Sequence, residues 1–210
     1  MNLTTSHLGE SKMTFMVGQK FPTATTPAVM ENGDVNNDFS VAEFGKGSYT
    51  VVFFYPLDFT FVCPTELVAF NKAMSQFEAL NCKVVAASVD SVFSHAAWRR
   101  TPLNDGGIEA VNYPMLSDIE RKLSNELGIL ADGGVTYRAS YLIDKNGVVR
   151  HMVINDLPLG RSVEEMLRMV DALDFHEKHG EVCPANWKKG EEGMSATKES
   201  TQAYLEKHAS

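Results

Sequence analysis

Cys63 stands where the chain is expected to make a thiol reactive. A run of strand-type residues from Tyr49 to Tyr55 breaks at Pro56, and an amphipathic segment begins at Cys63. The order is therefore a strand, a turn marked by proline, and a thiol in the first turn of a helix. Because the N–H groups at a helix N-terminus are unsatisfied and carry partial positive charge, they favour the thiolate over the thiol. The thiolate is the nucleophile, so this segment predicts thiol chemistry.

The residue types around this thiol are those that an activated sulfur needs, namely hydrogen-bond donors, positive charge and restricted water. The hydroxyl of Thr60 could face the sulfur across the turn, and Pro56 and Pro64 stiffen the turn and remove N–H groups. Arg138 and Arg161 are the candidate cations. An arginine in a strand usually only pairs with a carboxylate, but Arg138 interrupts a run that could otherwise be buried, which distinguishes it from a surface arginine.

Composition bounds the class of protein. The 210 residues have a net charge of −8 and a pI near 5.2, which argues against nucleic acid or an anionic membrane as the main partner. No stretch approaches the length of a transmembrane helix, and the N-terminus lacks the pattern of a secretory signal. Three cysteines without a C-x-x-C motif are sparse for a secreted protein, so we expect a cytoplasmic location.

Strand and helix patterns alternate along the chain and indicate an α/β fold with a mixed sheet covered on both faces. The expected strands are 49–55, 83–89, 113–116, 135–143 and 148–155, and the expected helices are 40–44, 63–80, 90–100, 118–127, 163–176 and 195–207. Asn146-Gly147 joins the last two strands as a hairpin. We divide the chain into an N-terminal extension (1–12), one domain (13–176) and a polar C-terminal arm (177–210).

These residues carry a resemblance to a family. The pattern Pro56-x-x-x-Thr60-x-x-Cys63, within FYPLDFTFVCPTE, resembles the active-site motif of the typical 2-Cys peroxiredoxins, the alkyl hydroperoxide reductase C/thiol-specific antioxidant family. The resemblance continues from Met16 to the C-terminus through AASVDS (86–91), NDLPLGR (155–161) and HGEVCPANW (179–187). It implies a thioredoxin-like fold whose central mixed sheet is flanked by helices, with an extended C-terminal arm and a short helix.

The resemblance also implies roles for the residues of the motif. Cys63 would be the peroxidatic cysteine, whose thiolate attacks the terminal oxygen of a hydroperoxide and becomes a sulfenic acid. Thr60 would hydrogen-bond the peroxide, Arg138 would hold the thiolate and the attacked oxygen, and Pro56 would shield the sulfur. Donors fixed in this way stabilise the negative charge that develops on the leaving oxygen.

Two further residues would orient Arg138 by the same resemblance. These are Glu66 and Arg161. For Glu66 an alternative stays open, because an acidic residue in the first turn of a helix is favourable by itself.

The other cysteines differ from each other. Cys183 follows Cys63 by 120 residues and lies in the polar arm. In the family the corresponding cysteine resolves the sulfenic acid of the partner subunit as an intersubunit disulfide, which implies an obligate dimer and commonly a decamer. Cys82 precedes a predicted buried strand and is expected to pack as a small hydrophobic residue or to lie near a subunit contact.

Two family features concern inactivation by excess peroxide. Sensitive members carry a Gly-Gly-Leu-Gly segment and a terminal Tyr-Phe pair. This chain has Gly106, Gly107, Ile108 and Glu109 at the first place, and Tyr204 and Leu205 at the second. Because both features are altered, we expect the arm to unlock readily and the sensitivity to be intermediate or low.

The sequence favours a peroxidase that needs no bound cofactor over other functions. A holdase chaperone role would be an interaction function without turnover, and the Tyr-Leu pair makes it less favoured. A thioredoxin-like disulfide exchanger would need C-x-x-C, and the histidines show no metal-ligand spacing beyond His176 and His179. The recycling reductase is expected to be thioredoxin or a dedicated flavoprotein, with thioredoxin favoured.

Overall fold

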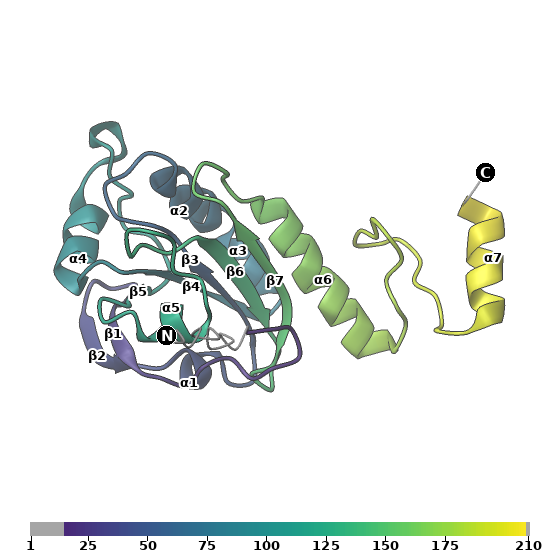
Figure 1. The fold of residues 1–210 in the computed structure, drawn as a ribbon. Helices are drawn as coiled ribbons and strands as arrows, with labels where there is room; N and C mark the ends of the chain where they lie inside the picture. The colour runs from purple at the N-terminus through teal and green to yellow at the C-terminus, as the bar shows by residue number, and fades with distance from the viewer. Residues whose placement is uncertain (1–14, 209–210) are drawn as a thin grey trace, which may run out of the picture.

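The computed structural model describes residues 15–208, which contain one seven-stranded mixed sheet (Figure 1). The strand order is β2-β1-β5-β4-β3-β6-β7, in which β3, β4 and β5 are parallel and the other pairs antiparallel. The strands are β1 (Thr26–Val29), β2 (Val35–Phe39), β3 (Tyr49–Phe54), β4 (Cys82–Ser88), β5 (Met115–Ser117), β6 (Arg138–Ile143) and β7 (Val149–Asn155). This arrangement confirms the predicted fold class.

Helices cover both faces of the sheet. They are α1 (Val41–Gly45), α2 (Cys63–Lys72), α3 (Met74–Ala79), α4 (Val92–Arg100), α5 (Lys122–Glu126), α6 (Val163–His179) and α7 (Lys198–His208), with a short 3₁₀ turn at Leu103–Asp105. One hydrophobic cluster lies under α2, α3 and α6, and a second lies under α1 and α5. Side chains of β3 alternate between the two, which is why this strand has no polar face.

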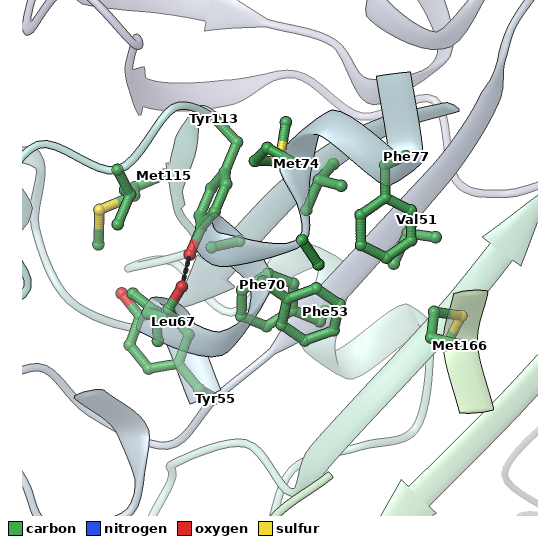
Figure 2. Close-up of a cluster of buried hydrophobic side chains, with 14 of the residues drawn as sticks. Val51, Phe53, Tyr55, Leu67, Phe70, Met74, Phe77, Tyr113, Met115 and Met166 are labelled. Atoms are coloured by element: carbon green, nitrogen blue, oxygen red, sulfur yellow. Dashed lines mark hydrogen bonds between the residues drawn. The ribbon is translucent and has the colours of Figure 1, made fainter. Parts of the chain in front are cut away.

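Helix α2 is fixed on the sheet by aromatic packing (Figure 2). The ring of Phe70 stacks on that of Phe53 in β3 with 4.1 Å between centroids. The Tyr113 hydroxyl donates a hydrogen bond to the Leu67 carbonyl at 2.6 Å. Both contacts lie in the buried cluster that includes Cys63. The position of the thiol is therefore set by the core rather than by a surface loop.

Several boundaries differ from the prediction. The helix predicted over 63–80 is two helices separated at Ala73, whose N–H is shared between the carbonyls of Ala69, Phe70 and Asn71. Helix α6 continues to His179, beyond its predicted end at residue 176. Strands β1 and β2 were not predicted as separate strands. The predicted extension, 1–12, lies outside the described residues.

The arm runs away from the domain and ends in α7 (Figure 1). Gly180 ends α6 with a left-handed φ of 70°, a conformation that glycine adopts without strain. Beyond it the chain turns back on α6, where Trp187 is buried against Phe175 with 4.9 Å between ring centroids. The Arg168 guanidinium also donates to the Trp187 carbonyl at 3.0 Å. Aromatic packing and one side-chain hydrogen bond thus connect the first part of the arm to α6.

The hairpin between β6 and β7 depends on a buried carboxylate. Asp144 accepts hydrogen bonds from the backbone N–H groups of Asn146 and Val148, at 2.8 and 2.9 Å, and from Arg150 Nε at 2.7 Å. Burial alone would raise the pKa of Asp144, but these donors outweigh it and lower the pKa. The charged form is therefore the one that stabilises the turn.

We expect the Asp144→Asn variant to lose about 1–2 kcal/mol of unfolding free energy at neutral pH, because hydrogen bonds to a charged acceptor are lost. A lowered pKa stabilises the fold above the ordinary carboxyl value and ceases to do so as the pH falls through the folded value. The difference between wild type and variant should thus shrink below about pH 4. Urea unfolding at several pH values measures it, and the exposed Asp132→Asn variant is the control. A difference that does not change with pH would contradict the role of the charge.

No helix among residues 15–208 is long and apolar enough to cross a membrane.

Candidate active site

Cys63 is the first residue of α2 and is 1% exposed. Val62 precedes the helix and supplies no side-chain cap, but its carbonyl accepts hydrogen bonds from the N–H groups of Thr65 and Glu66, at 3.1 and 3.3 Å. Strand β3 ends at Phe54, and the turn from Tyr55 to Val62 brings the chain back over the sheet. The predicted order of strand, turn and helix-terminal thiol is confirmed.

Arg138 contacts the sulfur from β6. Its Nη1 lies 3.4 Å from Cys63 Sγ and 2.8 Å from Glu66 Oε2, so one nitrogen bridges the thiol and a carboxylate. Its Nε donates to the Leu157 carbonyl at 2.7 Å. With its side chain 5% exposed, the guanidinium is withdrawn from water. A buried cation at this distance stabilises negative charge on the sulfur and on an oxygen bound beside it.

Glu66 joins two arginines. Arg161 donates to its carboxylate through Nε (2.9 Å), Nη2 (2.7 Å) and the backbone N–H (3.0 Å), while Arg138 donates from the other side. Burial lowers the pKa of Arg161, and the carboxylate of Glu66 opposes that shift. Arg161 Nη1 also donates to the carbonyls of Phe54 and Ala139, at 2.6 and 3.0 Å. The predicted site residues Cys63, Glu66, Arg138 and Arg161 therefore form one buried cluster.

The other two motif residues lie on the turn. Pro56 is buried, and its shielding of the sulfur stays a prediction. Thr60 is half-buried and its hydroxyl donates to the Leu57 carbonyl at 2.7 Å. Since that proton is engaged, the lone pairs of the hydroxyl remain available to accept a hydrogen bond.

Comparison with known proteins decides the family. The sequence model of the AhpC/TSA family matches residues 17–152, and that of the C-terminal domain of 1-Cys peroxiredoxin matches 172–207. The chain is 48% identical to alkyl hydroperoxide reductase C of Buchnera aphidicola (from Schizaphis graminum), over 93% of this chain and 99% of the relative. The chain belongs to the AhpC/TSA family of peroxiredoxins.

Other relatives agree with this assignment. Peroxiredoxin-2 of Bos taurus is 51% identical over 78% of this chain and 82% of its own length. The structure of reduced 2-Cys peroxiredoxin from Plasmodium vivax superposes with a TM-score of 0.87 at 43% identity, covering 90% of this chain and 98% of that one. This peroxiredoxin is therefore a thiol-dependent peroxidase.

A second buried network holds the turn before Cys63, and the sequence alone did not reveal it. Asp58 accepts from the Tyr55 hydroxyl at 2.7 Å and lies 2.8 Å from His95 Nδ1, while its backbone N–H donates to Asp90 at 2.9 Å. The other ring nitrogen of His95 faces the Leu116 carbonyl at 3.2 Å. Burial, followed by the charge of Asp58, raises the pKa of Tyr55 and of Asp90.

This network could have been anticipated only in part. A polar Asp58 inside an otherwise apolar turn and Asp90 at the end of a buried strand are both unusual placements. Nothing in the local pattern joins either one to His95, which lies on α4. The pairing is a property of the fold.

The three cysteines of this peroxiredoxin are all free, and they lie in different surroundings. Cys183 is half-buried at the start of the arm, with Sγ 3.5 Å from the Ala172 carbonyl of α6. Burial raises its pKa, and the nearby Arg168 partly opposes the shift. Cys82 begins β4, and burial raises its pKa to about 12. Cys82 is thus an unreactive core thiol, as its predicted packing requires.

The residues that we expect to influence inactivation lie in two separate places. The carbonyl of Gly106 accepts from the Trp98 indole at 2.9 Å, and Ile108 is buried. Glu109 has a positive φ of 54°, a conformation that the glycine of sensitive relatives adopts more easily. Tyr204 and Leu205 lie on α7, which stands apart from the domain in this chain (Figure 1).

Within residues 15–208, no group of three or more His, Cys, Asp or Glu side chains is placed to hold a metal ion.

Proposed function

We propose that this peroxiredoxin reduces hydrogen peroxide and organic hydroperoxides through a sulfenic acid on Cys63. Cys183 of the partner subunit resolves it as an intersubunit disulfide, which thioredoxin or a flavoprotein disulfide reductase then reduces. The observation that carries the proposal is the position of Arg138 Nη1, within reach of both the Cys63 sulfur and Glu66.

In the first step, the Cys63 thiolate attacks the terminal peroxide oxygen. A sulfur–oxygen bond forms, the oxygen–oxygen bond breaks, and the leaving alkoxide or hydroxide takes up a proton to give an alcohol or water. Arg138 stabilises the charge that moves from sulfur to the leaving oxygen, while Thr60 accepts a hydrogen bond from the protonated peroxide oxygen. Because Cys63 is 1% exposed, little water competes for these contacts.

In the second step, the Cys183 thiolate attacks the sulfenic sulfur, forms the disulfide and releases water after protonation. Burial raises the pKa of Cys183, which keeps it as a thiol in the reduced arm. The arm leads away from the domain that carries α2 (Figure 1), an arrangement that favours resolution in a partner over resolution in the same chain. In this mechanism the functional unit is a homodimer. We infer that five such dimers assemble into a decamer and that the protein acts in the cytoplasm.

Intact mass under non-reducing, denaturing conditions tests the cycle, measured after one equivalent of hydrogen peroxide. We expect wild type to give a covalent dimer linked between Cys63 and Cys183. Cys183→Ser should stop as a Cys63 sulfenic acid in a monomer, and Cys63→Ser should not be oxidised. A wild type that stays monomeric while Cys63 is oxidised would exclude Cys183 as the resolving residue. A disulfide within one chain would instead exclude the dimeric mechanism.

Sensitivity to excess peroxide is a separate expectation. Glu109 and Leu205 replace a glycine and a phenylalanine of sensitive family members. We therefore expect disulfide formation to be faster than further oxidation of Cys63. The measured quantity is the fraction of sulfinic acid on Cys63 after turnover with rising peroxide, and the Leu205→Phe variant should raise it. Conversion of wild-type Cys63 to sulfinic acid at the low peroxide levels that inactivate sensitive relatives would refute the expectation.

A further inference from the structure

A cavity of about 490 Å³ lies at the end of the sheet opposite Cys63. It is lined by the segment before β1, by α1, by the first part of β3 and by the turn between β6 and β7. Because Thr50 stands at the start of β3 and Cys63 follows the end of that strand, the cavity does not belong to the peroxidase site. Its volume is in the range of small-molecule sites, about 300–1,000 Å³.

The floor of the cavity is apolar and its rim is cationic. Phe21, Val41, Ala42 and Ile143 supply the apolar surface. Three lysines stand around it, although the protein as a whole has a net charge of −8: Lys20, Lys46 and Lys145. Apolar surface bounded by ammonium groups suits a ligand with a hydrophobic body and a negative end.

Two acidic residues, Glu43 and Asp144, also line the cavity, so its three lysines exceed its carboxylates by one. Asp144 is already satisfied by two backbone N–H groups and by Arg150. Lys145 forms an ion pair with Glu177, with 3.3 Å between Nζ and Oε2, and its ammonium group lies over the ring of Tyr49. Lys46 follows α1 and is exposed, and among residues 15–208 it has no ion-pair partner. It is therefore the lysine best able to receive an anion.

One wall of the cavity holds a buried hydroxyl without a partner. Thr50 is 1% exposed, and its Oγ1 makes no hydrogen bond among the described residues. Beside it stands Gly45, where an added Cβ would lie 2.2 Å from that oxygen. Glycine thus leaves the room that the hydroxyl occupies. This oxygen is fully buried against Gly45, so the wall of the cavity is closely packed there.

We propose that this cavity binds a small amphipathic carboxylate, a molecule with a short aliphatic or aromatic body and one anionic end. The body lies on Phe21, Val41 and Ile143, and the carboxylate pairs with Lys46 at the rim. Thr50 and Gly45 shape the wall between them. The site is separate from Cys63 and does not depend on the peroxidase cycle.

Titration of the reduced full chain with octanoate tests the proposal, followed by methyl NMR of isoleucine residues. The Ile143 methyl resonance should shift and saturate, while that of Ile108, which is buried in the other hydrophobic cluster, should not. Lys46→Glu should weaken binding about fivefold or more, the effect of one exposed ion pair. The matched control is Lys198→Glu at the exposed start of α7, which should leave binding unchanged.

Two further measurements test the proposal. Octanol has the same apolar body without the charge and should bind at least fivefold more weakly than octanoate. Ala42→Phe should fill the cavity and abolish the Ile143 shift. Equal binding of octanol, an unchanged affinity in Lys46→Glu, or octanoate shifts that do not include Ile143 would each overturn the proposal.

Discussion

Replacing Arg138 by methionine is expected to lower the second-order rate constant for oxidation of Cys63 by hydrogen peroxide about 100-fold or more. Removal of a single preorganised donor to developing negative charge commonly costs a factor of about 10²–10³. Arg138 Nη1 also lies 3.4 Å from Cys63 Sγ. The substitution therefore removes stabilisation from both the attacking sulfur and the leaving oxygen. Stopped-flow tryptophan fluorescence or competition with catalase measures the rate.

Two variants separate charge from geometry at this position. Arg138→Lys keeps a positive charge but cannot reach Cys63, Glu66 and the Leu157 carbonyl at once, so we expect it to recover only part of the rate. Arg100→Met removes an exposed arginine at the end of α4 and serves as the matched control. A rate for Arg138→Met within threefold of that control would show that the guanidinium does not act in the chemical step.

Replacing Glu66 by glutamine is expected to destabilise the fold by about 3–5 kcal/mol, because two buried guanidinium groups would lose their shared counter-ion. The carboxylate accepts four hydrogen bonds from Arg138 and Arg161, and the amide supplies only one oxygen to receive them. The peroxidase rate should fall as well, since Arg138 would lose one of the contacts that orient it.

Urea unfolding under reducing conditions, at one fixed protein concentration, measures this loss. The exposed Glu78→Gln variant on α3 is the control, and its stability should match that of wild type within about 0.5 kcal/mol. Glu66→Asp keeps the charge on a shorter side chain, so its loss should be smaller than that of Glu66→Gln. If Glu66→Gln and Glu78→Gln unfold at the same midpoint, the carboxylate is an ordinary residue of the first helical turn.

The parts of the fold predicted from sequence are those with a strong local pattern. Strand β3 is a nearly continuous apolar run, and Asn146-Gly147 marks the hairpin between β6 and β7 by residue type alone. Strand β2 was missed because its sequence, VNNDF, is exposed except at Phe39 and carries no alternation. The break at Ala73 was missed as well, since alanine is a strong helix former and gives no sign of a boundary.

The active site also has features that the local sequence predicts and features that depend on the fold. The helix-terminal position of Cys63 follows from its neighbours, and resemblance to a family supplied the roles of Thr60 and Arg138. That Arg138 reaches a sulfur 75 residues earlier in the chain depends on the pairing of β3 with β6. The contact of Asp58 with His95 depends likewise on where α4 packs, which no local pattern encodes.

The hydrogen bond from Arg138 to the Leu157 carbonyl connects the active site to the border of the sheet. Asn155, the last residue of β7, donates from its side chain to the carbonyls of Leu159 and Gly160, which closes the loop that presents Leu157. β7 is an outermost strand, and beyond Val149, whose backbone pairs with Gly18 and Gln19, its outer edge has no strand partner within residues 15–208. A molecule that pairs with the open part of this edge and steadies the loop would also steady the guanidinium. By thermodynamic reciprocity, a peroxide that fixes the guanidinium would then strengthen that pairing by the same free energy.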